Sequence, residues 1–151
     1  MAIIGLGSFL DQIKSFEQSA EQYYADLRDR TNNDGVRLLT HYLAKRKQHL
    51  PQALSLIKPK DLEEARGFPV LLSEDQIPGP ELFEENKLNE NATGAELLAT
   101  AIMFTEILLN LYEKMVELIP SGPAHGLFRT LTVIEHRSIV ELKKILAMNY
   151  F

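Results

Sequence analysis

The stretch FLDQIKSFEQSAEQYYADL, at residues 9–27, indicates a helical fold. Its apolar side chains recur every three or four residues, which is the spacing of one face of an α-helix. The resulting stripe consists of Phe9/Leu10, Ile13, Phe16/Glu17, Ala20, Tyr24 and Leu27. We expect the helix to begin at Ser8, because Ser8 and Asp11 have the spacing of a capping box, with Asp in place of the usual Glu.

The same period returns in three later segments. Together with the first, they predict four helices, over about residues 8–30, 36–57, 93–119 and 124–148. The second helix carries Arg46 at a stripe position, and Pro51 either bends this helix or marks the point where it restarts. The third helix opens on a complete capping box, formed by Thr93 and Glu96.

The connections between these helices are short, long and short. Residues 31–35, TNNDG, form turns readily, and such a short link makes the first two helices antiparallel neighbours. Residues 58–92 contain four prolines and lose the helical period, so we expect a long crossover with brief helical turns near residues 61–66 and 81–87. The sequence therefore predicts an all-α fold, an antiparallel four-helix bundle, in one domain over residues 1–151.

Composition narrows the classes of function. The net charge of −5 disfavours nucleic acid as a partner. The chain has no cysteine, so any metal ion must be held by histidine or carboxylate, and a rubredoxin-type iron centre is excluded. The apolar start lacks preceding basic residues and the apolar runs are short, so we expect no signal peptide, no membrane partner and a cytoplasmic location.

Three of the predicted stripes carry a glutamate: Glu17, Glu106 and Glu135. A buried carboxylate is costly unless it is paired or bound to a cation. Each glutamate could be neutralised by its own neighbours, or all three could converge on one cation site. Three such residues on separate helices favour convergence.

Four motifs on these helices carry a resemblance to a known superfamily. They are FEQSAEQYY at residues 16–24, LAKRKQH at 43–49, AIMFTE at 101–106 and LTVIEHRS at 131–138. Together they resemble the ferritin-like superfamily, in particular the rubrerythrin-like bundles. In that family, one Glu from each of two helices and a Glu-x-x-His from each of the other two hold two iron or manganese ions. The resemblance implies Glu17, His49, Glu106 and Glu135 as metal ligands.

Two positions depart from the family pattern. Arg46 stands where the second helix should supply a Glu, and Ser138 stands where the fourth should supply a His. A guanidinium forms two parallel hydrogen bonds with a carboxylate, so Arg46 could occupy the place of an ion. Tyr23, Tyr24 and Tyr112 could support the site through hydrogen bonds to the carboxylates, although aromatic side chains on an apolar stripe more often serve packing. The pattern therefore indicates a degenerate di-metal site.

Three functions remain open at the level of sequence. The favoured one is a non-catalytic binding or assembly protein, in which an Arg46-Glu-His network replaces the metals. The second is a rubrerythrin-like oxidoreductase that acts on oxygen or peroxide or handles iron, and the third is a mononuclear metal binder. For the cofactor, no metal is favoured over one iron or manganese ion, and one ion over two. A homodimer is expected, although the sequence does not identify its contact face.

Overall fold

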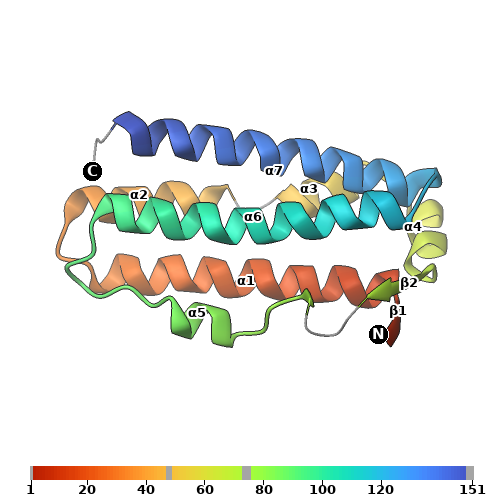
Figure 1. Ribbon diagram of the computed structural model, residues 1–151, viewed down its shortest axis with the longest axis horizontal. Helices are drawn as coiled ribbons and strands as arrows, with labels where there is room; N and C mark the ends of the chain where they lie inside the picture. Colours follow the sequence, from red (N-terminus) through yellow and green to blue (C-terminus); the bar gives the residue numbers. More distant parts are fainter. Residues whose placement is uncertain (1, 47–48, 73–75, 149–151) are drawn as a thin grey trace.

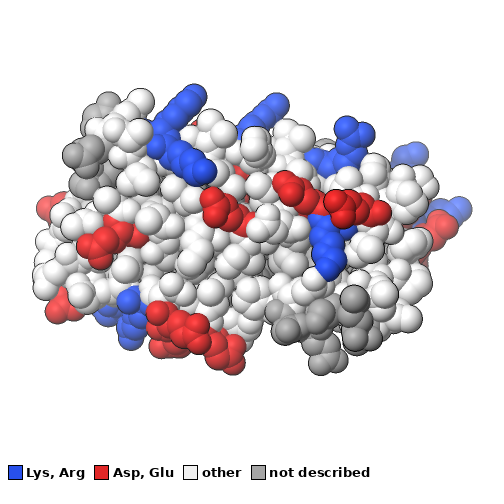
Figure 2. All heavy atoms as spheres, in the orientation of Figure 1, with Lys and Arg blue, Asp and Glu red and all other residues white. Residues whose placement is uncertain are grey.

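The computed structural model describes residues 2–46, 49–72 and 76–148, most of which are helical. Its elements are β1 (Ala2–Gly5), α1 (Leu6–Arg30), α2 (Asp34–Lys45), α3 (His49–Ser55), α4 (Pro59–Arg66), β2 (Pro69–Leu72), α5 (Glu81–Glu85), α6 (Gly94–Leu118) and α7 (Gly122–Met148). Long helices lie side by side along the length of the molecule (Figure 1). Acidic and basic side chains are both scattered over the face seen in Figure 2. The prediction of a mostly helical chain is confirmed.

The chain runs along the molecule four times in helical form. α1 runs one way, α2 and α3 return, and α6 and α7 run in opposite directions to each other (Figure 1). The expected crossover starts with α4 at one end, and its later part, which includes α5, passes along α1 back to the start of α6 (Figure 1). The core between these helices contains buried side chains from α1, α2, α6 and α7, such as Phe9, Leu43, Leu97 and Phe128.

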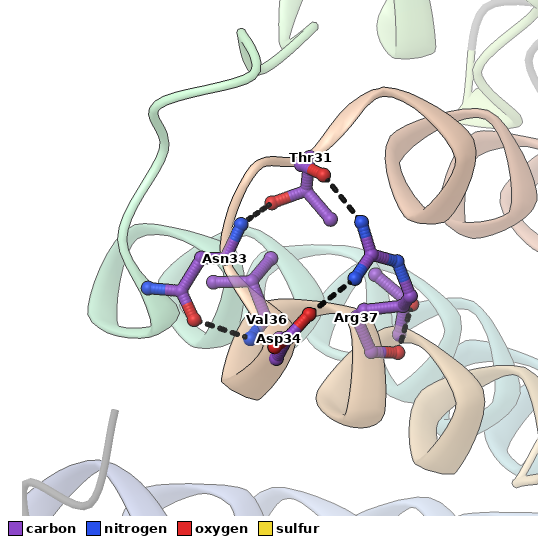
Figure 3. A network of polar contacts seen from close by, with 6 residues as sticks. Thr31, Asn33, Asp34, Val36 and Arg37 are labelled. Carbon is purple, nitrogen blue, oxygen red and sulfur yellow. Dashed lines mark hydrogen bonds and ion pairs between the residues drawn. The ribbon is translucent and has the colours of Figure 1, made fainter.

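Side-chain capping fixes the turn between α1 and α2, where the sequence predicted a tight link (Figure 3). Asn33 is the N-cap of α2, and its Oδ1 accepts a hydrogen bond from the Val36 amide at 3.1 Å. Arg37 donates to the Thr31 carbonyl at 2.7 Å and to Asp34 Oδ1 at 2.5 Å. These bonds satisfy polar groups that the end of one helix and the start of the next leave open.

A two-stranded sheet corrects the all-α prediction. β1 pairs with β2 in antiparallel register, with Ile3 opposite Leu71. The Leu6 amide then donates to the Phe68 carbonyl at 2.8 Å, so α1 begins at Leu6 without a side-chain cap. The predicted start at a Ser8 capping box is therefore wrong, because a backbone bond from the sheet already satisfies an amide at the helix start.

The break in the second predicted helix falls before Pro51. α2 ends at Lys45, and Pro51 lies in α3, which the structure describes as His49–Ser55. The prediction that the helix is interrupted in this region is confirmed by the turn at Arg46. α6 also starts as predicted, with Thr93 Oγ1 accepting from the Glu96 amide at 3.1 Å.

By length and composition alone, α6 could cross a membrane. Half of its most apolar stretch is buried inside the molecule. The core helix of a soluble protein passes the same test. The apolar character of α6 is accounted for by its core position, since Leu97, Phe104 and Met115 are all buried.

Candidate functional site

A small polar cavity lies between α1, the α2–α3 break, α6 and α7. Its volume is about 30 Å³. Predicted site residues from α1, from the region between α2 and α3, and from α7 line it: Glu17, Tyr24, Arg46, His49, Glu135 and Ser138. The remaining walls are mostly apolar, with Leu43, Phe104, Leu108 and Leu142 among them. The structure therefore brings most of the predicted site together.

His49 and Glu135 form the inner pair of this site. Glu135 is only 4% exposed, and one of its carboxylate oxygens lies 3.2 Å from His49 Nδ1. The ring can donate a hydrogen bond to the carboxylate when Nδ1 carries the proton. A protonated imidazole would turn the contact into an ion pair, and either form lowers the cost of burying Glu135.

Arg46 closes the outer side of the cavity. Its Nη2 donates to Ser138 Oγ at 2.8 Å, and its Nη1 donates to Glu141 Oε2 at 2.5 Å and to the Tyr42 hydroxyl. The guanidinium also lies over the Tyr42 ring, 5.2 Å from its centroid. The hydrogen bond that Arg46 donates to Glu141, together with the charge of Arg46, lowers the pKa of Glu141 below its usual range.

The carboxylate partner of Arg46 differs from the expectation. The sequence placed Arg46 against the stripe glutamates, but the structure pairs it with Glu141, whose side chain is 56% exposed. Glu141 follows Ser138 by three residues, so both side chains lie on the same face of α7. The predicted network is thus two adjacent contacts: Arg46 with Ser138 and Glu141 outside, and His49 with Glu135 inside.

Glu106 is not among the residues that line the cavity, and the expectation that its side chain is buried is wrong. Its side chain is 48% exposed, and its Oε1 lies 3.9 Å from Lys143 Nζ. Phe104 fixes this rotation of α6, because it packs against the Phe83 and Tyr23 rings at centroid distances of 4.9 and 5.2 Å. Turning Glu106 inward would remove this aromatic side chain from the core. α6 faces the cavity with Thr105 instead.

The three predicted tyrosines have different positions. Tyr24 lines the cavity, whereas the Tyr23 hydroxyl donates to the Asn86 carbonyl at 2.6 Å, on the crossover. Tyr112 is fully buried, and burial raises its pKa well above the usual value, with smaller contributions from the charges of Glu17 and Glu135. Tyr24 and Tyr112 therefore lie close to the carboxylates, and Tyr23 does not support the site.

Sequence reasoning missed three contributors, Tyr42, Thr105 and Glu141. Tyr42 precedes Arg46 by four residues and Glu141 follows Ser138 by three, so helical spacing alone could have linked each to a predicted site residue. Thr105 was hidden because it neighbours Glu106, and a stripe read from sequence does not separate two adjacent positions. The signal for Thr105 lies in Phe104, the larger side chain that sets the helix rotation.

Three side chains of the cavity could act as metal ligands: Glu17, His49 and Glu135. As placed, no three His, Asp or Glu side chains of the described residues form a group that could hold a metal ion. The arrangement can exchange a proton between His49 and Glu135, and it can hold a species of about the size of one water molecule.

Comparisons of the chain with protein-family models, with curated proteins and with solved structures give no significant match. The ferritin-like resemblance therefore rests on the four helix motifs and their spacing.

Proposed function

We propose that this chain is a ferritin-like antiparallel four-helix bundle whose di-metal site has been replaced by a side-chain network, and that it serves as a non-catalytic binding or assembly protein. One observation carries the proposal. Arg46 and Ser138, the two positions that depart from the family pattern, bond directly to each other, with 2.8 Å between Arg46 Nη2 and Ser138 Oγ. A guanidinium and a hydroxyl thus make a direct contact where the family pattern has two metal ligands.

The charges of the site support this proposal. Arg46 is paired with Glu141 outside the cavity, and Glu135 has His49 as its hydrogen-bond partner inside it. Of the three glutamates that the resemblance assigned to metal, Glu106 lies on the surface. Oxygen or peroxide chemistry at a di-metal centre would need two ions and open coordination positions, and the family pattern supplies four carboxylates for that purpose. Glu17 and Glu135 are the two carboxylates among the described cavity residues.

The order of connections supports the fold part of the proposal. A short link joins α1 to α2, a long crossover leads to α6, and a short link joins α6 to α7. Bundles with one long crossover include the ferritin-like folds. In this proposal the bundle is kept as a scaffold, and recognition of partners moves to its surface.

A mononuclear metal binder is the second candidate, because Glu17, His49 and Glu135 line one cavity of about 30 Å³. Two carboxylates and one imidazole are a ligand set that suits a divalent ion such as iron, manganese or zinc. In that case the ion would take the place of the proton between His49 and Glu135. The rubrerythrin-like oxidoreductase is the weaker candidate, since it needs a second ion.

The metal content of the protein, purified without chelator and with iron and manganese in the medium, tests these alternatives. We expect less than about a tenth of an equivalent of bound metal, since the network leaves few free ligands. Elemental analysis by mass spectrometry of the wild type, Glu135→Gln and Glu106→Gln makes the measurement. One equivalent that is lost in Glu135→Gln and kept in Glu106→Gln would establish the single-ion site, and two equivalents would contradict the proposal.

A further inference from the structure

A hollow with both apolar and charged lining residues lies at the end of the molecule where α3 leads into α4. Its volume is about 360 Å³, and Ile57, Gly126 and Leu127 are among its lining residues. A Cβ added to Gly126 would meet no atom within 4 Å, so this part of α7 is open to solvent. Leu127 is buried beneath the hollow and Ile57 is half-buried beside it. The hollow is unrelated to the polar cavity described above.

A projecting leucine stands on the rim of this hollow. Leu56 is 81% exposed, the highest value among the large apolar side chains of the described residues. Single exposed leucines are common on protein surfaces, but Leu56 is also one of the residues that line the hollow. The interface of a two-fold dimer is self-complementary, so each copy can offer both the projecting Leu56 and the hollow to the other copy.

The charges around the hollow are self-complementary as well. Lys58 and Asp61 both line it, and among the described residues neither takes part in an ion pair. In a two-fold contact, residue i of one copy faces residue j of the other, and residue j faces residue i. If two copies insert Leu56 into each other's hollow, Lys58 of each copy can pair with Asp61 of the other. A lysine and an aspartate on one small face thus attract a second copy.

The neighbouring face of α7 can extend this contact. Gly126 and Thr130 line the hollow, and Val133 follows them at helical spacing with 48% exposure. These small and β-branched side chains allow close approach of another helix. Their contribution matters because a stable dimer generally buries about 800 Å² on each partner, more than a hollow of this size provides.

We propose that the protein forms a two-fold symmetric homodimer through this face, with Leu56 of each copy inserted into the hollow between α3, α4 and α7 of the other. The occupant is a second copy of the same chain. A contact of this kind leaves the polar cavity inside each bundle intact.

Sedimentation equilibrium over a range of concentrations tests the proposal. We expect a dimer for the wild type and a dissociation constant that rises roughly 30-fold or more for Leu56→Asp, the loss typical of a central anchor. Leu38→Asp is the matched control, since Leu38 is 66% exposed on α2, and it should leave the dissociation constant unchanged. Thermal unfolding followed by circular dichroism checks that each variant keeps its fold.

Exchanging the charges of Lys58 and Asp61 tests the proposed dimer independently of Leu56. Lys58→Asp should weaken the dimer, and the double variant Lys58→Asp/Asp61→Lys should recover most of the loss. Lys58 is the N-cap of α4, where aspartate is a favourable residue, so weaker association could not be ascribed to a damaged helix. A wild type that is monomeric at every concentration would overturn the proposal. So would a dimer that Leu56→Asp leaves intact, or one that Leu38→Asp disrupts.

Discussion

Tyr112 carries a buried hydroxyl that has no hydrogen-bond partner among the described residues. Its side chain is fully buried, and the charges of Glu17 and Glu135 add to the rise in its pKa that burial causes. An unpaired buried hydroxyl costs about 1–3 kcal/mol of stability. Tyr23 is also on the inner side of its helix, but its hydroxyl donates a hydrogen bond to the Asn86 carbonyl. The two tyrosines therefore differ in what the hydroxyl contributes.

Replacement of each tyrosine by phenylalanine measures this difference. We expect Tyr112→Phe to leave the free energy of unfolding unchanged or to raise it by about 1 kcal/mol, because the unpaired group is removed. Tyr23→Phe should lower it by about 1 kcal/mol, the usual worth of a hydrogen bond. Urea denaturation of the three proteins supplies the values. If Tyr112→Phe were the more damaging change, the hydroxyl would have a partner in solution.

Tyr112 also sets a limit on stability at alkaline pH. Its pKa in the folded state lies above that of the unfolded chain, and the same holds for Tyr24, where burial is again the main cause. Their contribution to stability is therefore complete below the unfolded pKa of about 10 and is lost as the pH rises above it. The unfolded chain ionises there, while the folded one resists ionisation.

At the scale of elements, the cap of α2 should decide how well the α1–α2 turn is held. Asn33→Ala removes the acceptor of the Val36 amide and should lower the free energy of unfolding by about 1 kcal/mol. Asn32→Ala is the matched control, because its side chain is exposed and makes only a long contact of 3.4 Å with Asn91. Equal losses in the two variants, measured by urea denaturation, would show that capping is not the cause.

The sequence did not predict the rotation of α6 about its own axis. The three-and-four spacing predicted the helix and its capped start at Thr93, but it allowed either Thr105 or Glu106 on the inner face. Phe104 decides between them through rings on α1 and α5, which are distant in sequence. The sheet was missed for a similar reason, since β1 and β2 are each four residues long and their pairing spans about half the chain.

At the scale of the whole molecule, the polar cavity could be predicted because its residues stand on the apolar stripes of different helices. Glu17, Arg46, His49, Glu135 and Ser138 were all expected at one site, and all line one cavity. The pairing within the site was not predictable. Which carboxylate Arg46 meets depends on its place beside the α2–α3 break, where the guanidinium reaches the exposed Glu141 on α7. Periodicity carries no information about such a tertiary detail.

We propose that Arg46 and Ser138 occupy positions where the ferritin-like pattern has metal ligands. Restoring the family residues with Arg46→Glu/Ser138→His should add a carboxylate and an imidazole to Glu17, His49 and Glu135 around the cavity. Isothermal titration with manganese measures the number of bound ions in this variant, in the wild type and in the control Arg46→Gln/Ser138→Ala. We expect the restored variant to gain at least one bound ion that the wild type and the control lack. Equal binding by all three proteins would contradict it.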